Sequence, residues 1–399
     1  MQSFIFCYLF SKSTYYTINM NTSNTQLSAF PDSKNHYKIL DGLRGVAAII
    51  VVAFHVFETH STSHQDQIIN HGYLAVDFFY VLSGFVIGYA YDDRWGKMTL
   101  AGFFKRRLIR LHPMVIMGMI VGAIGFYFQA CNYWPTISQT PAWKMLFVML
   151  IGFTLIPVPL SMDIRGWHEM HPLNGPGWSL FFEYIANILY AVFVRKFSNT
   201  ALSILVILSG IALIHLAVTS TNGDIIGGWS VEPEQLRIGI SRLMYPFFAG
   251  LLLSRINRLS PIKYSFLLSS MLVIIFLSIP RIGGTTHLWM NGLYDSLCVI
   301  LIFPLIVFIG ANGEIKGKYT SKLCKFLGDI SYPIYITHYP IIYIYTAWVS
   351  DNKVPLQQAW PMGILVLFSS ILLAYVCLKF YDMPLRKWLG NRFIYKTPN

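Results

Sequence analysis

The chain has 399 residues, of which 55% are hydrophobic and only 12% charged, whereas a soluble domain carries about a quarter charged residues. This composition excludes an ordinary soluble globular protein and predicts an all-α, polytopic integral membrane protein, folded as a helical bundle. The net charge of +12 does not indicate nucleic-acid binding, because the basic residues lie in loops between apolar runs and fit membrane orientation better.

The two ends of the chain are polar and differ from the rest. We expect residues 1–36 to form a disordered cytoplasmic extension, and both Met1 and Met20 remain open as the true start. Residues 37–388 are expected to form one membrane domain, and residues 389–399 a short basic cytoplasmic tail. The five cysteines lack the spacing of a metal site or a disulfide framework, so no metal is expected.

Ten segments are apolar and long enough to cross a bilayer, which takes about 20 residues. They are residues 43–60, 73–91, 108–128, 177–194, 200–218, 237–255, 262–280, 291–310, 329–349 and 360–381. An eleventh apolar run, MLFVMLIGFTLIPVPL at residues 145–160, is shorter and ends among prolines. We expect this run to be re-entrant or to lie in the outer interface.

The basic residues of the loops favour this arrangement. With ten spans and a cytoplasmic N-terminus, nearly all of them fall on the cytoplasmic side, and the exceptions are Lys144, Arg165, Arg281 and Lys353. A full crossing by residues 145–160 would place the later basic loops outside. The positive-inside bias therefore predicts that both termini are cytoplasmic.

The first span, within LDGLRGVAAIIVVAFHVF, carries Arg44 near its start and His55 deeper in the membrane. At about 3.6 residues per turn the two side chains lie on one helix face, about 16 Å apart. A buried neutral imidazole could serve as a general base, but a histidine bonded to a neighbouring helix is equally consistent with the residue alone. For Arg44, a marker of the cytoplasmic boundary is favoured over an anion site.

The second span and the helix that follows it carry further polar residues. Asp77 could orient a histidine, pair with an arginine or simply sit at the interface, and Ser83 is better explained by helix packing than as a nucleophile. In FFKRRLIRLHPM, Arg107 and Arg110 share a helix face at the cytoplasmic boundary. They suit phosphate binding, although the positive-inside rule or lipid head groups would also account for them.

The fourth span, in NGPGWSLFFEYIANILY, places Ser179 and Glu183 on one face. Glu183 is the only acid of that span, so it is expected to face a partner or a polar cavity. Trp178 could stack on a sugar, although an interfacial tryptophan is the commoner explanation. In SYPIYITHYP, Tyr335 and His338 face together and favour a polar chamber.

Taken together, these motifs resemble the acyltransferase family 3 membrane proteins, which are bacterial O-acyltransferases of surface polysaccharides and related acceptors. The resemblance rests on DGLRGVAAIIVVAFH, AVDFFYVLSGFVIG, FFKRRLIRLHP, GPGWSLFFEY, SRLMYPFFAGLLL and SYPIYITHYP, which span about residues 37–388. It implies ten spans in the bacterial inner membrane. The polar extension has no counterpart in the family pattern, and we expect no fused extracytoplasmic esterase-like domain after Arg386.

The resemblance also implies residue roles. His55 corresponds to the catalytic base and Arg44 and Glu183 to the other catalytic residues of the family pattern, and the pair Arg107 and Arg110 corresponds to the site of the acyl-CoA donor. We expect substrate contacts from a further set of residues: Asp77, Ser83, Trp178, Ser179, Arg242 and His338.

The leading hypothesis is an acyltransferase that moves an acyl group, acetyl foremost, from cytoplasmic acetyl-CoA or another acyl-CoA to a carbohydrate hydroxyl. A direct attack with His55 as base and a covalent acyl-histidine remain open. The alternatives are a transporter of a glycan or lipid intermediate and a catalytically inactive sensor or scaffold. Expected partners are acyl-CoA, a carbohydrate acceptor and membrane lipids, while the acceptor's identity, the acyl group and the oligomeric state stay undetermined.

Overall fold

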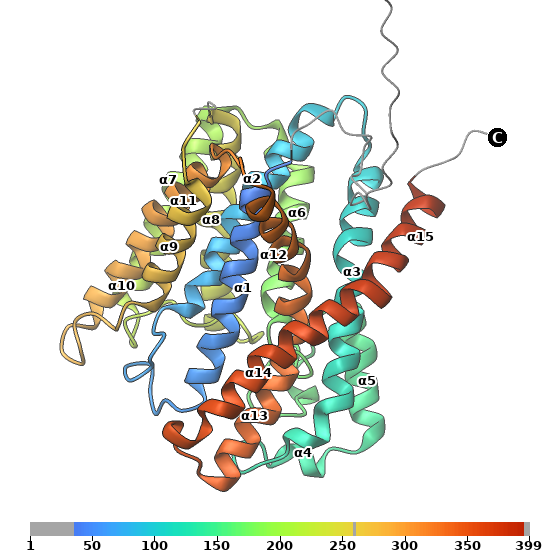
Figure 1. Cartoon of the computed structure of the whole chain (residues 1–399), viewed down its shortest axis with the longest axis vertical. Coiled ribbons are helices and arrows are strands. Elements are labelled where there is room, and N and C mark those ends of the chain that lie inside the picture. Colours follow the sequence, from blue (N-terminus) through green and yellow to red (C-terminus); the bar gives the residue numbers. More distant parts are fainter. Residues whose placement is uncertain (1–35, 258–260, 395–399) are drawn as a thin grey trace, which may run out of the picture. The chain divides into compact units, whose positions relative to one another are not determined.

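The computed structural model describes residues 36–257 and 261–394. The expected N-terminal extension, apart from His36, and residues 395–399 of the expected tail lie outside this range. The described residues form helices and one isolated bridge between Ile262 and Gly313. The fold is therefore an all-α bundle, as predicted (Figure 1).

The helices follow one another along the chain, with longer connections after the first, fifth and seventh α-helices. The α-helices are α1 (Lys38–Glu58), α2 (Ala75–Tyr91), α3 (Leu100–Gly125), α4 (Thr136–Gln139), α5 (Ala142–Phe153), α6 (Gly177–Val192), α7 (Asn199–Thr219), α8 (Pro233–Ile256), α9 (Ser265–Ser278), α10 (Leu288–Leu297), α11 (Phe303–Ala311), α12 (Lys318–Thr337), α13 (Tyr339–Asn352), α14 (Leu356–Cys377) and α15 (Met383–Phe393). Single turns of 3₁₀-helix are η1 (Gly72–Leu74), η2 (Asp92–Arg94), η3 (Phe126–Gln129), η4 (Leu160–Met162) and η5 (Val194–Lys196), and the π-helical turns are η6 (Cys298–Ile302) and η7 (Leu378–Asp382).

Eight of the described helices are long and apolar enough to cross a membrane, and they correspond to eight of the ten expected spans. The span expected at 262–280 is instead α9, whose 14 residues reach about 21 Å, less than the roughly 30 Å of a bilayer core. The span expected at 329–349 is divided at His338, where α12 ends and α13 begins with Pro340 in its first turn. Proline is tolerated there because a helix's first turn has no intrahelical acceptor for its N–H.

The run at residues 145–160 enters the bundle and returns to the end where it began. It forms α5, which lies beside α3 (Figure 1) and stops at Phe153. The chain then comes back, so that Lys144 Nζ, near the start of α5, donates to the carbonyl of Asp163 at 3.0 Å. This path agrees with the prediction that the segment does not cross.

Two helix pairs are held close by glycines. In the pair α2 and α8, a Cβ on Gly84 would collide with the backbone of Phe247, and one on Gly250 would collide with that of Val81. In the pair α1 and α12, Gly45 lies against the backbone of Leu327. Helices in lipid gain little from burying apolar surface, so close backbone approach at small residues supplies much of their packing energy.

The outer surface of the bundle carries many exposed apolar side chains, as expected for a surface in contact with lipid. On α7, for example, Ile204, Ile207, Leu208 and Ile211 are each more than half exposed. Large exposed apolar surfaces are rare on soluble proteins. The multiple apolar helices make this a multi-pass membrane protein.

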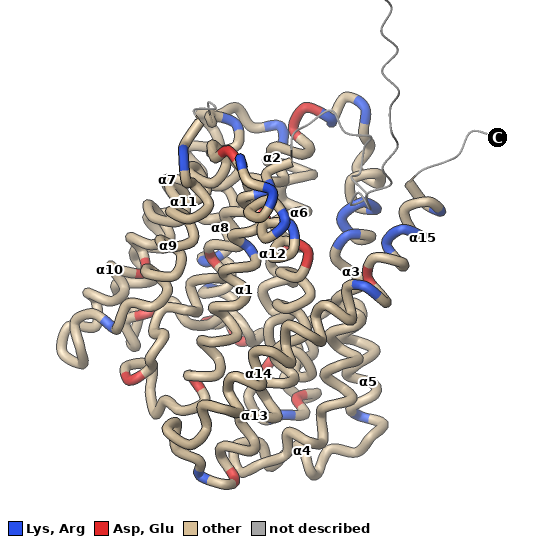
Figure 2. The backbone as a smooth tube through the Cα atoms, in the orientation of Figure 1, with Lys and Arg blue, Asp and Glu red and all other residues tan. Residues whose placement is uncertain are grey.

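Charge divides the bundle into two different ends. Figure 2 shows Lys and Arg gathered at its upper end and along α3 and α15, with few at the lower end. Helix α3 begins with Thr99 as N-cap, whose hydroxyl accepts from the N–H of Gly102 at 3.0 Å. Helix α14 continues through η7 into α15, which brings the last basic residues of the described chain back toward α3 (Figure 1). We call the end of the bundle where these Lys and Arg residues gather the basic end.

Candidate functional site

The first feature of the site is a histidine paired with a carboxylate. His55 lies near the end of α1, and its Nδ1 is 2.6 Å from Oε2 of Glu58, three residues later. The imidazole is 17% exposed. When Nδ1–H donates to the carboxylate, Nε2 keeps its lone pair and can accept a proton. The dyad thus has the arrangement that a general base requires.

A second histidine and a tyrosine enclose this imidazole. The ring of His338 stacks on that of His55, with centroids 5.5 Å apart, and Tyr339 meets it edge-on at 4.6 Å. His338 is fully buried, and its Nδ1 lies 3.0 Å from the carbonyls of both Ile334 and Tyr335. These bonds fix the proton on Nδ1, so Nε2, which has no partner in the described protein, is an acceptor. A hydroxyl-bearing ligand would satisfy it.

Ser179 connects the histidines to the start of α6. Its hydroxyl donates to the carbonyl of Pro176 at 3.0 Å and shares a 2.7 Å hydrogen bond with the hydroxyl of Tyr335. The hydroxyl of Tyr80 on α2 donates to the Ser179 carbonyl at 2.9 Å. Three helices that are distant in sequence are therefore joined at Ser179, and the ring of its partner Tyr335 lies next to that of His338.

Glu183 lies at the centre of a separate charged cluster. Its Oε1 accepts from Ser83 Oγ at 2.7 Å and from Arg107 Nη2 at 2.8 Å. Arg107 is 8% exposed on its side chain, so its guanidinium lies inside the bundle. The expected pair of Arg107 and Arg110 is consequently divided, with Arg107 bound to Glu183. Glu183 is therefore bound to Ser83 and Arg107. The carboxylate partner of His55 is instead Glu58.

Asp77 and Arg242 form a buried ion pair. Nε and Nη2 of Arg242 donate to the carboxylate at 3.3 and 2.6 Å. Nη2 also donates to the carbonyl of Tyr73 at 2.8 Å, and Nη1 donates to that of Gly227 at 3.2 Å. Trp178 is buried and packs with its ring centroid 5.3 Å from the guanidinium carbon. The three residues thus brace α2, α6 and α8. Their mutual contacts occupy the groups that we expected to meet substrate.

Arg110 lies within electrostatic range of arginines from two other helices at the basic end. Arg110 on α3 interacts electrostatically with Arg44 on α1, with Arg386 on α15 and with Arg107. Arg44 donates to Asp41 at 3.4 Å, and Arg386 donates to the buried Asp382 at 3.0 Å. Like charges repel, so a bound anion would stabilise this grouping. We call Arg44, Arg110 and Arg386 the arginine cluster.

The opposite end contains a buried charged group around Arg165, one of the few basic residues that the sequence analysis assigned to the non-cytoplasmic side. Arg165 is fully buried, lies 3.3 Å from Glu169 and stacks on Tyr343, with 3.5 Å between its guanidinium carbon and the ring centroid. The hydroxyl of Tyr343 donates to Glu169 at 2.7 Å. Burial raises the pKa of Glu169 to about 7 although Arg165 opposes the shift. This group anchors the loop before α6 to α13.

Sequence reasoning missed two residues of the site. Glu58 follows His55 at the i,i+3 spacing of helix neighbours, a signal that was present in AFHVFE. Arg386 was counted only as one of many cytoplasmic charges. Its approach to Arg110 depends on the path of α14 and α15, which no local pattern encodes.

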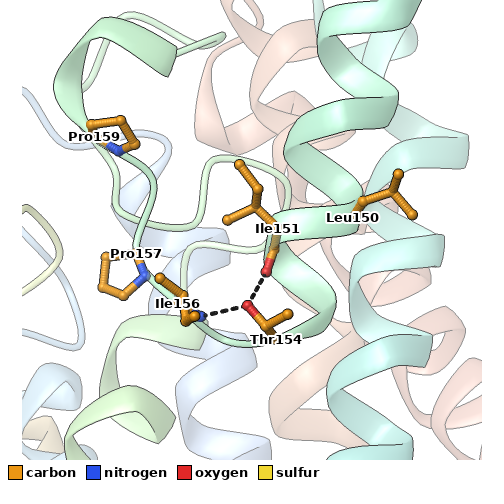
Figure 3. Close-up of a pocket in the computed structure, with 6 residues that line it drawn as sticks. All are labelled: Leu150, Ile151, Thr154, Ile156, Pro157 and Pro159. Carbon is orange, nitrogen blue, oxygen red and sulfur yellow. Dashed lines mark hydrogen bonds between the residues drawn. The ribbon is translucent and has the colours of Figure 1, made fainter.

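The described residues hold two cavities of interest. Figure 3 shows one of about 460 Å³ at the end of α5, lined by Leu150, Ile151, Thr154, Ile156, Pro157 and Pro159. It contains no ionisable side chain, so it offers nothing for acid–base chemistry. The other, of about 560 Å³, is lined by both polar and apolar side chains and lies beyond the end of α1. Within the described ranges, no three His, Cys, Asp or Glu side chains are grouped to hold a metal ion.

Comparison with known proteins places the chain in a family. The sequence pattern of the family described as "Acyltransferase domain" matches residues 37–379. The O-acetyltransferase OatA of Staphylococcus aureus is 22% identical over 379 residues, covering 87% of this chain and 57% of that protein. The peptidoglycan O-acetyltransferase OatA of Listeria monocytogenes is 25% identical over 414 residues, covering 91% of this chain and 57% of that protein.

A shorter relative is more similar. Protein 2 in the picA locus of Rhizobium radiobacter is 31% identical over 160 residues, covering 38% of this chain and 80% of that protein. The chain thus spans somewhat more than half the length of the two OatA relatives. No solved structure matches it.

Proposed function

The chain belongs to the acyltransferase domain family, and from that membership we propose that it transfers an acyl group, acetyl foremost, from acyl-CoA to a hydroxyl of a cell-surface or lipid-linked glycan. The observation that carries the proposal is the His55–Glu58 dyad, with 2.6 Å between Nδ1 and Oε2, next to His338. The dyad supplies a base near the C-terminal end of α1, whereas Arg44 of the arginine cluster lies near the N-terminal end of the same helix.

The donor binds at the arginine cluster. Coenzyme A carries several phosphates, and guanidinium groups bind phosphate through charge-assisted, often bidentate hydrogen bonds. Arg110, Arg44 and Arg386 supply these groups, while Arg107 keeps its bond to Glu183 and holds α3 against α6. The flexible pantetheine arm then extends into the bundle toward His55. The positive-inside rule assigns the basic end to the cytoplasm, where acyl-CoA is found, in a bacterial inner membrane.

The reaction needs one proton relay. As the acceptor oxygen attacks the thioester carbonyl, Nε2 of His55 takes the hydroxyl proton, and the resulting imidazolium is stabilised by Glu58. The tetrahedral intermediate collapses with loss of the CoA thiolate, which recovers the proton from His55. A covalent acyl-histidine route uses the same Nε2 as nucleophile. Parallel double-reciprocal plots would favour that route, and intersecting ones the direct attack.

The decisive experiment measures radiolabelled acetyl transfer from acetyl-CoA to the surface-glycan fraction at matched membrane expression. We expect His55→Ala to lose about 10²–10⁴-fold of the wild-type rate, the range for general base catalysis. Acetyl-CoA should still raise the melting temperature of the variant, because its donor site is intact. Equal labelling by both proteins would refute the role of His55, and no labelling by wild type would refute the donor or the acceptor.

A further inference from the structure

The cavity of about 560 Å³, whose lining mixes polar and apolar side chains, lies at the opposite end of the bundle from the arginine cluster. One wall is the last turn of α1 with the loop after it, another is the α13–α14 connection, and Tyr133 closes a third side. The lining residues that offer hydrogen bonds are Thr59, His60, Ser61, Thr62, Asp66, Ser350, Lys353 and Gln357. The size falls within the roughly 300–1,000 Å³ of ligand pockets.

This cavity begins within about one helical turn of His55. Thr59, which lines it, follows His55 by four residues and therefore lies on the same face of the helix, about 6 Å further along. The Thr59 hydroxyl lies 3.1 Å from the His55 carbonyl and 2.9 Å from the hydroxyl of Thr346 on α13. His60 is hydrogen-bonded at 2.7 Å to the hydroxyl of Tyr345. These bonds hold the cavity wall at a constant position relative to the catalytic histidine.

We propose that this cavity is the acceptor site, and that it binds an uncharged sugar unit of the glycan while a neighbouring unit presents its hydroxyl to His55. This inference rests on the proposed function. The non-reacting part of the acceptor thereby supplies binding energy that orients the reacting hydroxyl.

The chemistry of the lining selects the ligand class. Hydroxyl and amide groups such as those of Ser350 and Gln357 match the hydroxyls of a sugar, and the ring of Tyr133, which is 58% exposed, offers a face for its apolar side. The two charged side chains, Asp66 and Lys353, are of opposite sign. The hydrogen bond from Thr62 lowers the pKa of Asp66 to about 2, so its negative charge persists and disfavours an anionic polymer. The neutral class is therefore favoured.

The test blocks the cavity reversibly. In a Cys7→Ser, Cys131→Ser background, Gln357→Cys is treated with a bulky, membrane-impermeant methanethiosulfonate and assayed for acetyl transfer to the glycan fraction. We expect at least tenfold loss after treatment and recovery after dithiothreitol. Gln358→Cys is the matched control, because Gln358 is the next residue, is exposed and does not line the cavity. Its transfer should change less than twofold.

A second variant and a binding measurement keep the result interpretable. Ser350→Cys, on the opposite side of the connection, should behave like Gln357→Cys. Acetyl-CoA should raise the melting temperature of every treated protein equally, since the donor site is remote. Unchanged transfer after modification at both positions would overturn the acceptor site while leaving the proposed function intact. Absence of transfer by the unmodified background protein would overturn the proposed function, and the acceptor site with it.

Discussion

His55 acquires its chemical character from neighbours on two different elements. Glu58, on its own helix, fixes which nitrogen carries the proton, and His338, at the α12–α13 junction, lies against the ring. A histidine alone would be consistent with a simple helix contact. Glu58 adds a negative charge beside the ring, which stabilises the imidazolium that forms when His55 takes up a proton in the transition state. A histidine with a purely structural role would not need this charge.

Replacing Glu58 tests this relation directly. We expect Glu58→Gln to lower kcat about 10- to 100-fold with little change in either KM, because the base is misoriented while both substrates still bind. Glu58→Asp should recover part of the loss. The control is Glu234→Gln, which removes another exposed carboxylate in an i,i+3 pair, with Arg237. An unchanged kcat in Glu58→Gln would contradict the positioning role.

The buried pair of Arg242 and Asp77 predicts a different result, on stability. Arg242→Leu leaves Asp77 charged and without its partner in the interior, which costs about 3–5 kcal/mol of unfolding free energy. Arg237→Leu removes an exposed arginine from the same helix, and its salt bridge is worth about 1 kcal/mol or less. Denaturant unfolding in detergent measures both variants. A stable Arg242→Leu protein with a raised acceptor KM would instead restore the substrate-binding role.

The residues that sequence reasoning found are those whose signal is local. An ionisable side chain within an apolar run can be recognised from the sequence alone, as for His55, Glu183 and Arg242. The partner is not visible when it comes from another helix: Ser83 meets Glu183, and Arg386 approaches Arg110, across bends and crossings that only the fold provides.

At the scale of elements, α3 and α15 form the proposed donor site together. The continuous run α14–η7–α15 crosses the bundle (Figure 2). Arg386 on this run lies within electrostatic range of Arg110. A π-helical turn often marks a functional position in a helix, and η7 ends at Asp382, the partner of Arg386. The geometry of α15 is therefore coupled to the arginine cluster.

Removing Arg386 should weaken the donor site. We expect Arg386→Ala to raise the KM for acetyl-CoA about tenfold and to leave the acceptor KM unchanged, because one of three phosphate-binding cations is lost. Arg392→Ala, exposed near the end of the same helix, removes equal charge and should change the donor KM less than twofold. Equal effects of the two variants would mean that only the overall field of the basic end matters.

The contact between the loop after α1 and the loop after α7 is expected to depend on pH. His64, in the loop after α1, is 2.9 Å from Asp224 in the loop after α7, and Arg281 lies 3.2 Å from the same carboxylate. The hydrogen bond to Asp224 raises the pKa of His64 despite partial burial and the repulsion of Arg281. Its stabilisation is therefore complete below the unfolded pKa of about 6.5 and is lost as pH rises through the higher folded value.

The corresponding measurement compares wild type with His64→Gln across pH. The melting temperature of wild type should exceed that of the variant most at pH 5.5, and the difference should vanish by pH 8.5. His287→Gln is the control, because His287 lies in an exposed loop at the same end and bonds only to its neighbour Thr286 among the described contacts of its ring. A difference that grows with pH would have the wrong sign for this ion pair.

At the scale of the whole molecule, the bundle joins two chemically different ends. Apolar runs of about 20 residues made most spans predictable, because a bilayer imposes length and hydropathy locally. The division at His338 and the short α9 were not predictable in this way. Long apolar stretches look alike whether or not a helix junction interrupts them, and the junction depends on how Pro340 and its neighbours pack.

The proposed orientation makes a prediction that involves the whole chain at once. If α5 returns to its own end and the basic end is cytoplasmic, exposed positions at Ser161 and Thr285 face outward, and Gly96 faces inward. In intact cells an impermeant maleimide should label Ser161→Cys and Thr285→Cys but not Gly96→Cys, in the Cys7→Ser, Cys131→Ser background. Gly96 is a suitable site because an added Cβ meets nothing within 4 Å. Permeabilised cells, in which all three should react, control for accessibility.

The three positions distinguish the possible topologies. Inversion of the whole bundle would exchange the pattern, so that only Gly96→Cys reacts in intact cells and the donor site faces outward, away from acyl-CoA. A full crossing by residues 145–160 would separate Ser161 from the end occupied by Lys144, contrary to the bond between Lys144 and Asp163. It would also invert every later loop, which places Thr285 inside. Labelling of Ser161 and Thr285 together, with Gly96 protected, is thus compatible only with a bundle whose basic end faces the cytoplasm, where acyl-CoA is found, and whose other end faces outward.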